Sequence, residues 1–145
     1  MHTDTQQARD PGVAKIRALL LAARPRLAAE SRELAASFKK PLAKPGEAVP
    51  DRSPAVAPLI EHLKTLRAEV EGVTVQGAAA VSARDLTVQA LLETEQSLGK
   101  LAESYAAPDQ TSATVLLAES VRLLKDAKAT SAKAGKALNI PWPLQ

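Results

Sequence analysis

Residues 59–105 read LIEHLKTLRAEVEGVTVQGAAAVSARDLTVQALLETEQSLGKLAESY, and this stretch decides the expected fold. Apolar residues recur in it at alternating intervals of four and three, beginning with Leu59, Leu63 and Leu66. Such a heptad pattern is typical of a long helix packed along its length against other helices. Because the stretch contains no proline, we expect one central helix over about 55–106. It would be roughly 70 Å long at about 1.5 Å per residue.

The middle of this stretch is its weakest part. Gly72 and Gly77 each cost up to about 1 kcal/mol in a helix interior, and Val73-Thr74-Val75 between them is β-branched. A break between 72 and 85 is therefore the alternative to one continuous helix. The small residues from Gly77 onward would otherwise let a neighbouring helix come close, which makes Gly77 a candidate interaction residue.

Polar residues also occupy seam positions of the heptad pattern, at Arg84, Thr87 and Thr94. Polar residues at such positions can fix the register or the oligomeric state of a coiled coil. They can instead lie where no other helix covers the seam. Arg84 is a candidate interaction residue on the first interpretation.

The composition predicts an all-α protein. Alanine and leucine, both strong helix formers, make up about a third of the 145 residues, whereas aromatic residues make up 2%. An alanine-rich core buries little apolar area per residue, since one buried methyl contributes only about 0.8 kcal/mol. Stability must then come from many close helix contacts within a monomer or from association with other chains, and we favour association.

The N-terminal third predicts one helix followed by an extended connection. Asp10-Pro11 is a helix start, and the helix should run over about 11–39 with a kink near Pro25, since an interior proline removes a backbone hydrogen bond. Five prolines, four or five residues apart, then mark residues 40–58 as a proline-rich crossover. Ser53-Pro54 resembles the start of the next helix.

The C-terminal third predicts a helix over about 110–138. A tight turn at Pro108-Asp109 precedes it, and Thr111 or Ser112 is expected to cap it. The short turn makes it antiparallel to the end of the central helix. Its expected apolar face comprises Leu116, Leu117, Val121, Leu123, Leu124, Ala127, Ser131, Ala134 and Leu138.

Residues 139–145 form an extended tail that carries the only tryptophan. Prolines order such a backbone before it docks, and tryptophan is a common binding anchor. The tail either caps its own bundle or docks on another subunit or partner. Its candidate interaction residues are Pro141, Trp142, Pro143 and Leu144.

The charge pattern argues for helix packing rather than for nucleic acid. Residues 1–52 carry a net charge of +4, residues 53–108 carry −3 and residues 109–145 carry +2. Opposite charges of this kind help to choose neighbouring helices within or between chains. Nucleic acid is not an expected partner, because base stacking needs aromatic residues. A lipid surface is a lesser possibility, through the amphipathic helix at 11–39.

The sequence contains few residues from which to build an active site. Cysteine is absent, and His2 and His62 stand apart from other metal-ligating residues. No phosphate-binding glycine loop or nucleophile elbow is present. We therefore expect no metal, no cofactor and no enzymatic activity.

These features predict a single domain over 1–145, an elongated three-helix bundle or coiled coil with a long central helix. We expect a non-enzymatic assembly protein of a bacterial or phage-type structure, such as a virion, tail or secretion component, that forms homo-oligomers or joins other proteins. Without a signal peptide or transmembrane segment, it would be cytoplasmic or part of an assembled particle. The alternative is a small adaptor or regulator that binds a protein, lipid surface or polyanion through the helix at 11–39 and the proline-rich crossover.

Overall fold

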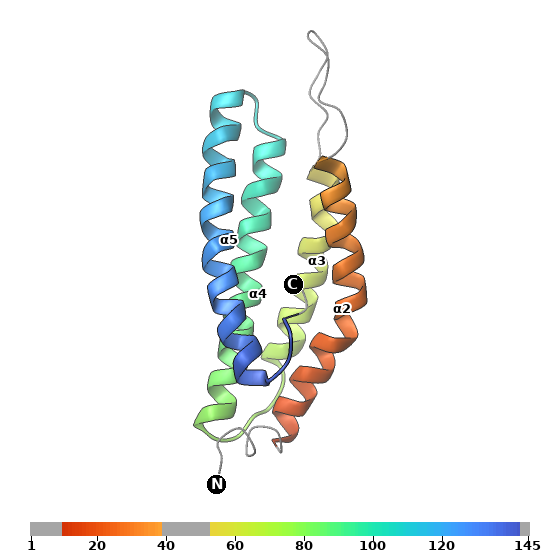
Figure 1. Cartoon of the computed structure of the whole chain (residues 1–145), viewed down its shortest axis with the longest axis vertical. Coiled ribbons are helices and arrows are strands. Elements are labelled where there is room, and N and C mark those ends of the chain that lie inside the picture. Colours follow the sequence, from red (N-terminus) through yellow and green to blue (C-terminus); the bar gives the residue numbers. More distant parts are fainter. Residues whose placement is uncertain (1–9, 39–52, 143–145) are drawn as a thin grey trace.

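The computed structural model describes residues 10–38 and 53–142, and the regular elements in this part of the chain are four α-helices (Figure 1). They are α2 (Pro11–Phe38), α3 (Ser53–Glu71), α4 (Ala78–Tyr105) and α5 (Gln110–Leu138). The all-α prediction is confirmed. The three-helix architecture is wrong, because the expected central helix is two helices, α3 and α4.

The break between α3 and α4 lies inside the region that the sequence marked as weak. α3 ends at Glu71, and α4 begins at Ala78 after Gly77, whose φ of 87° lies in the left-handed region that favours glycine. The β-branched residues between the helices take non-helical backbone. Val73 remains 4% exposed, so the connection is packed into the protein rather than looped away from it.

The N-terminus of α2 is held against this connection. Asp10 Oδ1 accepts hydrogen bonds from the backbone N–H groups of Gly12 (2.8 Å) and Val13 (3.1 Å), as expected of a helix cap. Asp10 Oδ2 also accepts from the N–H of Gln76, at 3.4 Å. The cap of one helix therefore also binds the connection between two others.

Among the described residues, four prolines are helical: Pro11, Pro25, Pro54 and Pro58. α2 is helical from Pro11 to Phe38, through Pro25. Pro25 is exposed, so water can reach the carbonyl that it leaves without a helical partner. α3 begins at Ser53, as the Ser53-Pro54 helix start predicted. The extension of the proline-rich crossover to residue 58 is therefore wrong, because Pro58 lies inside α3. Pro54 is in the first turn, where the missing N–H costs little. Residues 39–52 of the predicted crossover lie outside the described residues.

The α2–α3 pair carries the bulky part of the core. Buried residues repeat every seven positions on both helices, as in an antiparallel coiled coil. On α2 they are Val13, Ile16, Leu20, Leu27 and Leu34, and on α3 they are Val56, Leu59, Leu63, Leu66 and Val70.

The α4–α5 hairpin is packed through small residues. Ser97 Oγ donates to the Ser120 carbonyl at 2.9 Å, and Ser120 Oγ donates to the Ser97 carbonyl at 2.8 Å. Because the helices are antiparallel, the residue seven positions after Ser97 on α4 pairs with the residue seven positions before Ser120 on α5, and the same holds in the other direction. We call each such pair a layer. The layers are Ala83 with Ala134, Ala90 with Ala127, Ser97 with Ser120, and Ser104 with Ala113. Small residues at such contacts let helix axes approach to about 8 Å.

Thr87 and Thr94 also lie buried on α4, at 0% and 6% exposure. Their hydroxyls donate to the carbonyls of Ala83 (2.7 Å) and Ala90 (2.8 Å) of the same helix. The interpretation that these seam positions face solvent is therefore wrong.

The helices are arranged in the spatial order α5, α4, α3, α2 (Figure 1). α4 packs extensively on both α5 and α3, whereas among the helices α5 packs extensively only on α4. Figure 1 shows the chain turning back after α5, towards the side of α2 and α3. Most of the surface of α5 is therefore left without another described helix against it.

Candidate functional site

The outward surface of α5 carries apolar side chains that no other described element covers. Leu117 is 45% exposed, Val121 59% and Leu124 40%. Their spacing of four and then three residues places them on one side of the helix, and we call them the apolar stripe. Val115 is also exposed, at 56%, but it lies on the opposite side of the helix from the stripe. Contiguous exposed apolar side chains of this kind mark association surfaces.

The sequence assigned the apolar stripe to the core, and the structure contradicts this assignment. The residues of α5 that face inward include Ser120, Ala127 and Ala134, each 5% exposed or less. α4 presents a matching row of small residues at intervals of seven. Close packing of the small residues of α5 on the small residues of α4 outweighs burial of the leucines of α5. The two rows of small residues meet only when α5 is rotated so that its leucines face outward. Comparing the positions of small residues in α4 with those in α5 would have predicted the exposed stripe, whereas the apolar residues of α5 alone did not.

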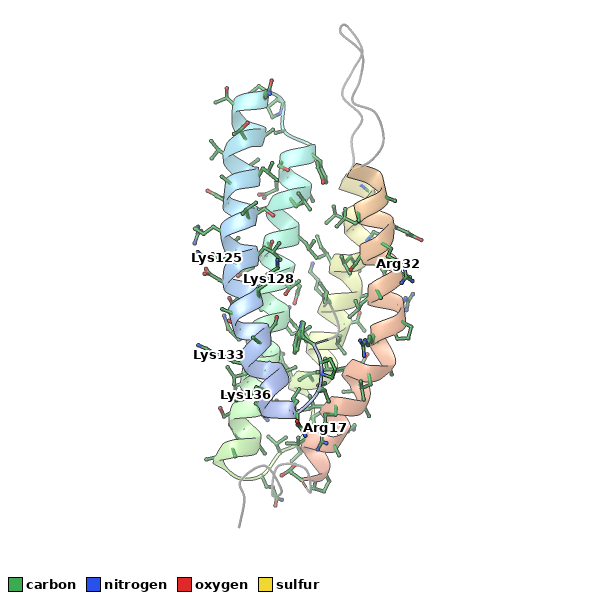
Figure 2. The ribbon with its side chains drawn as sticks, viewed as in Figure 1. Arg17, Arg32, Lys125, Lys128, Lys133 and Lys136 are labelled. Carbon is green, nitrogen blue, oxygen red and sulfur yellow. The ribbon has the colours of Figure 1, made fainter. Side chains whose placement is uncertain are left out.

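The second half of α5 is basic on its outward surface. Arg122, Lys125, Lys128, Lys133 and Lys136 are all exposed, and we call them the basic segment. None of the five forms an ion pair with a residue that the structure describes. Figure 2 shows Lys125 and Lys133 projecting from α5 away from the other helices. At about 100° per residue, Lys128 continues the side of α5 that carries the apolar stripe, and Lys125 and Lys136 flank it, whereas Arg122 and Lys133 lie farther round the helix.

Basic residues elsewhere do not join this segment. Figure 2 places Arg17 and Arg32 on α2, a different helix from the labelled lysines. Lys100 on α4 lies 3.1 Å from Glu103 and 3.7 Å from Glu119, and its hydrogen bond with Glu103 raises its pKa. The basic segment of α5 is therefore separate from the exposed basic residues of α2.

The predicted docking tail packs on its own chain. Trp142 is 2% exposed and belongs to the hydrophobic core with the leucines of α2 and α3. Pro141 is exposed, whereas Pro143 and Leu144 lie outside the described residues. Of the two uses that the sequence left open for the tail, the structure shows Trp142 in the first, where it caps its own bundle.

A Schellman motif aims the tail at this position. Asn139 has φ 56° and ψ 45°, the left-handed conformation that commonly ends a helix. The N–H of Asn139 bonds the Lys136 carbonyl at 3.2 Å, and the N–H of Ile140 bonds the Gly135 carbonyl at 3.0 Å. A Cβ on Gly135 would lie 3.0 Å from the Ile140 carbonyl, so the tail turns across α5 where it has no side chain.

Gly77 and Arg84, the other predicted interaction residues, lie at the start of α4. Gly77 is exposed and precedes the first helical residue. Arg84 is half-buried; its Nη1 donates to the Val73 carbonyl at 3.4 Å, and its Nε lies 3.4 Å from Asp85. The contacts of Arg84 support the connection between α3 and α4.

Besides the Lys100–Glu119 pair, two contacts between a basic and an acidic side chain link neighbouring helices among the described residues. Arg67 of α3 donates from Nε to Glu95 of α4 at 2.5 Å, and from Nη1 to Glu71 at 3.0 Å. The hydrogen bond with Glu95 raises the pKa of Arg67. His62 of α3 bonds Glu30 of α2 through Nδ1. Each pair joins adjacent helices and so supports the order of the bundle.

Among the residues that the structure describes, no three histidine, cysteine, aspartate or glutamate side chains are grouped closely enough to hold a metal ion. None of the described helices has the length and apolar character needed to cross a membrane. Comparison with family models, curated proteins and solved structures finds no match to this chain.

Proposed function

We propose that this protein is a non-enzymatic assembly protein that works by helix–helix association, with the outward surface of α5 as its contact surface. The observation that carries the proposal is the apolar stripe. Leu117, Val121 and Leu124 expose 40–59% of their surface on a helix whose buried residues are mostly alanine and serine. Apolar side chains at this spacing are what a partner helix packs against.

Two further features support an association role. α5 packs extensively on α4 alone among the helices, so a partner helix can approach its outward surface. In the described part of the chain, the large hydrophobic residues that are exposed all lie on α5, except Leu21 on α2. The surface of α5 is therefore favoured over the helix at 11–39, which the adaptor interpretation would use. A larger bacterial or phage-type structure is the proposed setting, on composition alone.

Site-specific photo-cross-linking tests this proposal. A photoreactive phenylalanine analogue replaces Val121 in the full chain, which is expressed in its native cells and irradiated. We expect a discrete protein adduct, since Val121 is the most exposed residue of the stripe. Lys64 on α3, with 54% of its side chain exposed, is the matched control position and should give no such adduct.

The mass of the adduct separates the two kinds of assembly. An adduct of twice 15.3 kDa would indicate a second copy of the chain, and any other discrete mass would indicate a different protein. Both results support association through α5. The proposal fails if position 121 gives no discrete adduct, or if position 64 gives the same one.

A further inference from the structure

The apolar stripe is too short to hold a partner by itself. A stable interface buries about 800 Å² on each partner, and three half-exposed side chains supply only a fraction of that area. A helix that packs along the stripe must continue along α5 to bury more surface. On the side of α5 that carries the stripe, the exposed residues towards the C-terminal end include Lys128, which Lys125 and Lys136 flank.

Among the residues that the structure describes, no acidic side chain forms an ion pair with the basic segment. Lys125 and Lys136 are eleven residues apart, so their Cα atoms span about 16 Å of helix. Lys128 and Lys133 lie between them, and Asp126 is the one acidic residue in this span. Cations in such an uncompensated row repel one another and favour an approaching surface of opposite charge.

A second copy of the chain does not supply that surface from its described residues. Most acidic side chains of α3, α4 and α5 already lie in an ion pair with lysine or arginine: Glu61, Glu71, Asp85, Glu95, Glu103 and Glu119. Glu93 accepts a hydrogen bond from Thr130, and Asp109 caps α5. Of the acidic residues before α3, Asp10 caps α2 and Glu30 bonds His62. The described acidic residues left over, Glu33, Glu69 and Asp126, are on three different helices and form no row.

We infer that the occupant of the α5 surface is an acidic amphipathic helix of another protein. Its apolar residues would pack on Leu117, Val121 and Leu124, and its aspartate or glutamate residues would face Lys125, Lys128 and Lys136. The apolar contacts supply the buried area, while the charges select the partner and its register. This inference rests on the proposed function and names the partner that it requires.

Fluorescence anisotropy with a synthetic helix tests the inference. The probe is a labelled peptide of about 24 residues, the length that spans α5 from the stripe through the basic segment. It has leucines on one face at one end and glutamates on the same face at the other. It is made in both sequence orders, because the partner can lie parallel or antiparallel to α5. Two control peptides have the same composition in scrambled order, or glutamine in place of glutamate.

We expect the acidic amphipathic peptide to bind the full-length protein at physiological salt. The glutamine and scrambled peptides should bind about tenfold more weakly or worse, since several surface ion pairs are lost together. The protein variant Lys128→Glu with Lys136→Glu should lose binding to the same extent. Lys64→Glu on α3 makes the charge change of one of these substitutions away from the surface and should leave binding unchanged.

Three outcomes would overturn the inference. If Leu117→Ser with Val121→Ser abolishes binding but neither the glutamine peptide nor the lysine variant weakens it, the partner is not acidic and the proposed function stands. If vesicles of anionic phospholipid or duplex DNA bind through the same lysines and the peptide does not, the partner belongs to another class. If the protein forms dimers through the stripe that the peptide cannot displace, the occupant is a second copy.

Discussion

Gly12, in the first turn of α2, lies where the chain has no room for a side chain. A Cβ there would be 2.2 Å from the Thr74 carbonyl oxygen and 2.7 Å from a methyl group of Val75. Replacing glycine by alanine in a helix usually stabilises it by about 0.5–1 kcal/mol. Gly12→Ala should instead lower the free energy of unfolding, because the backbone of the α3–α4 connection must move.

Gly99→Ala is the matched control for Gly12→Ala. Gly99 lies inside α4, and nothing is within 4 Å of a Cβ at that position. This substitution should raise the free energy of unfolding by about 1 kcal/mol. Urea denaturation followed by circular dichroism measures both. Equal effects of the two substitutions would contradict the close approach of α2 to the connection.

Trp142 should contribute more to stability than its place near the C-terminus suggests. Because it is 2% exposed within the core, Trp142→Ala should lower the free energy of unfolding by about 3–5 kcal/mol. Urea denaturation followed by circular dichroism tests this, with exposed Pro141→Ala as the control that changes little. In the wild type, the emission of this single tryptophan should shift to the red when the protein unfolds. An unchanged stability of Trp142→Ala would exclude the tail from the core.

Asp109 makes the stability of α5 depend on pH. Asp109 Oδ1 accepts a hydrogen bond from the N–H of Ser112 at 2.7 Å, and Asp109 Oδ2 accepts one from the Ser112 hydroxyl at 3.1 Å. The bond from the N–H, and after it the bond from the hydroxyl, lowers the pKa of Asp109. Because the folded pKa is below the unfolded value of about 3.9, the charged form stabilises the fold. This contribution is complete above the unfolded pKa and is lost as the pH falls through the folded one.

Comparison of Asp109→Asn with the wild type measures this pH dependence. Asparagine can still accept the hydrogen bond but does not titrate. The difference in free energy of unfolding between the two proteins should therefore be larger at pH 7 than at pH 2.5. A difference that stays constant over this range would mean that the Asp109 cap does not act through its charge.

At the scale of the elements, the α4–α5 hairpin depends on residues that are small enough. Ala127 is 1% exposed and faces the Ala90 layer of α4. Ala127→Leu should lower the free energy of unfolding by about 1–3 kcal/mol, because the added methylenes force the closely packed helices apart. Ala129→Leu places the same side chain on the exposed surface and should change it by less than about 0.5 kcal/mol.

Thermal and urea denaturation of these two alanine variants provide the measurement. If Ala127→Leu were as stable as Ala129→Leu, α4 and α5 would not be in close contact at this layer. The same register that buries Ala127 also exposes Leu117 and Leu124, so this result also tests why the apolar stripe faces outward.

Some elements could be predicted from the sequence because their signals are local. The helix expected over 110–138 is α5, Gln110–Leu138, since the turn at Pro108-Asp109 and the break at Asn139 are set by neighbouring residues. The cap was misplaced by two or three residues: Asp109, rather than Thr111 or Ser112, accepts the capping hydrogen bond. The start of α2 at Asp10-Pro11 was likewise readable from two residues.

Other features could not be predicted because they depend on contacts distant in sequence. Gly72 and Gly77 cost only about 1 kcal/mol each, too little to decide between a break and a continuous helix. The break is supported by Asp10, 66 residues from Gln76, whose N–H it binds. The small residues of α4 decide which side of α5 faces inward. The hydrophobic pattern of α5 alone carries no information about α4, so it could not predict this rotation. The candidate site was therefore missed, although its residues had been singled out.

For the whole molecule, one charged pair ties α3 of the α2–α3 pair to α4 of the α4–α5 hairpin. Glu95 is 6% exposed and is bound by Arg67 from α3. Arg67→Met should lower the free energy of unfolding by about 3 kcal/mol, because it leaves a buried carboxylate without its cation. Arg67→Met with Glu95→Leu should recover most of this loss, since the buried charge is then removed as well.

A double-mutant cycle in urea separates these effects. It comprises the wild type, Arg67→Met, Glu95→Leu and the double variant. The coupling between the two positions should be well above the 0.5 kcal/mol expected of independent sites. A double variant no more stable than Arg67→Met would show that the pair does not hold the two halves together through its charges.

The seven-residue layers of α4 and α5 have a consequence for how the chain can change in length. One heptad added to the end of α4 and another to the beginning of α5 would move the turn at residues 106–109 outward by about 10 Å. The paired alanine and serine rows would stay in register, and the core around Trp142 would be untouched. An insertion of three or four residues in one helix alone would rotate every later layer out of alignment. The length of the hairpin can therefore change in steps of one whole heptad on each helix, by duplication of a heptad, while the rest of the fold stays the same.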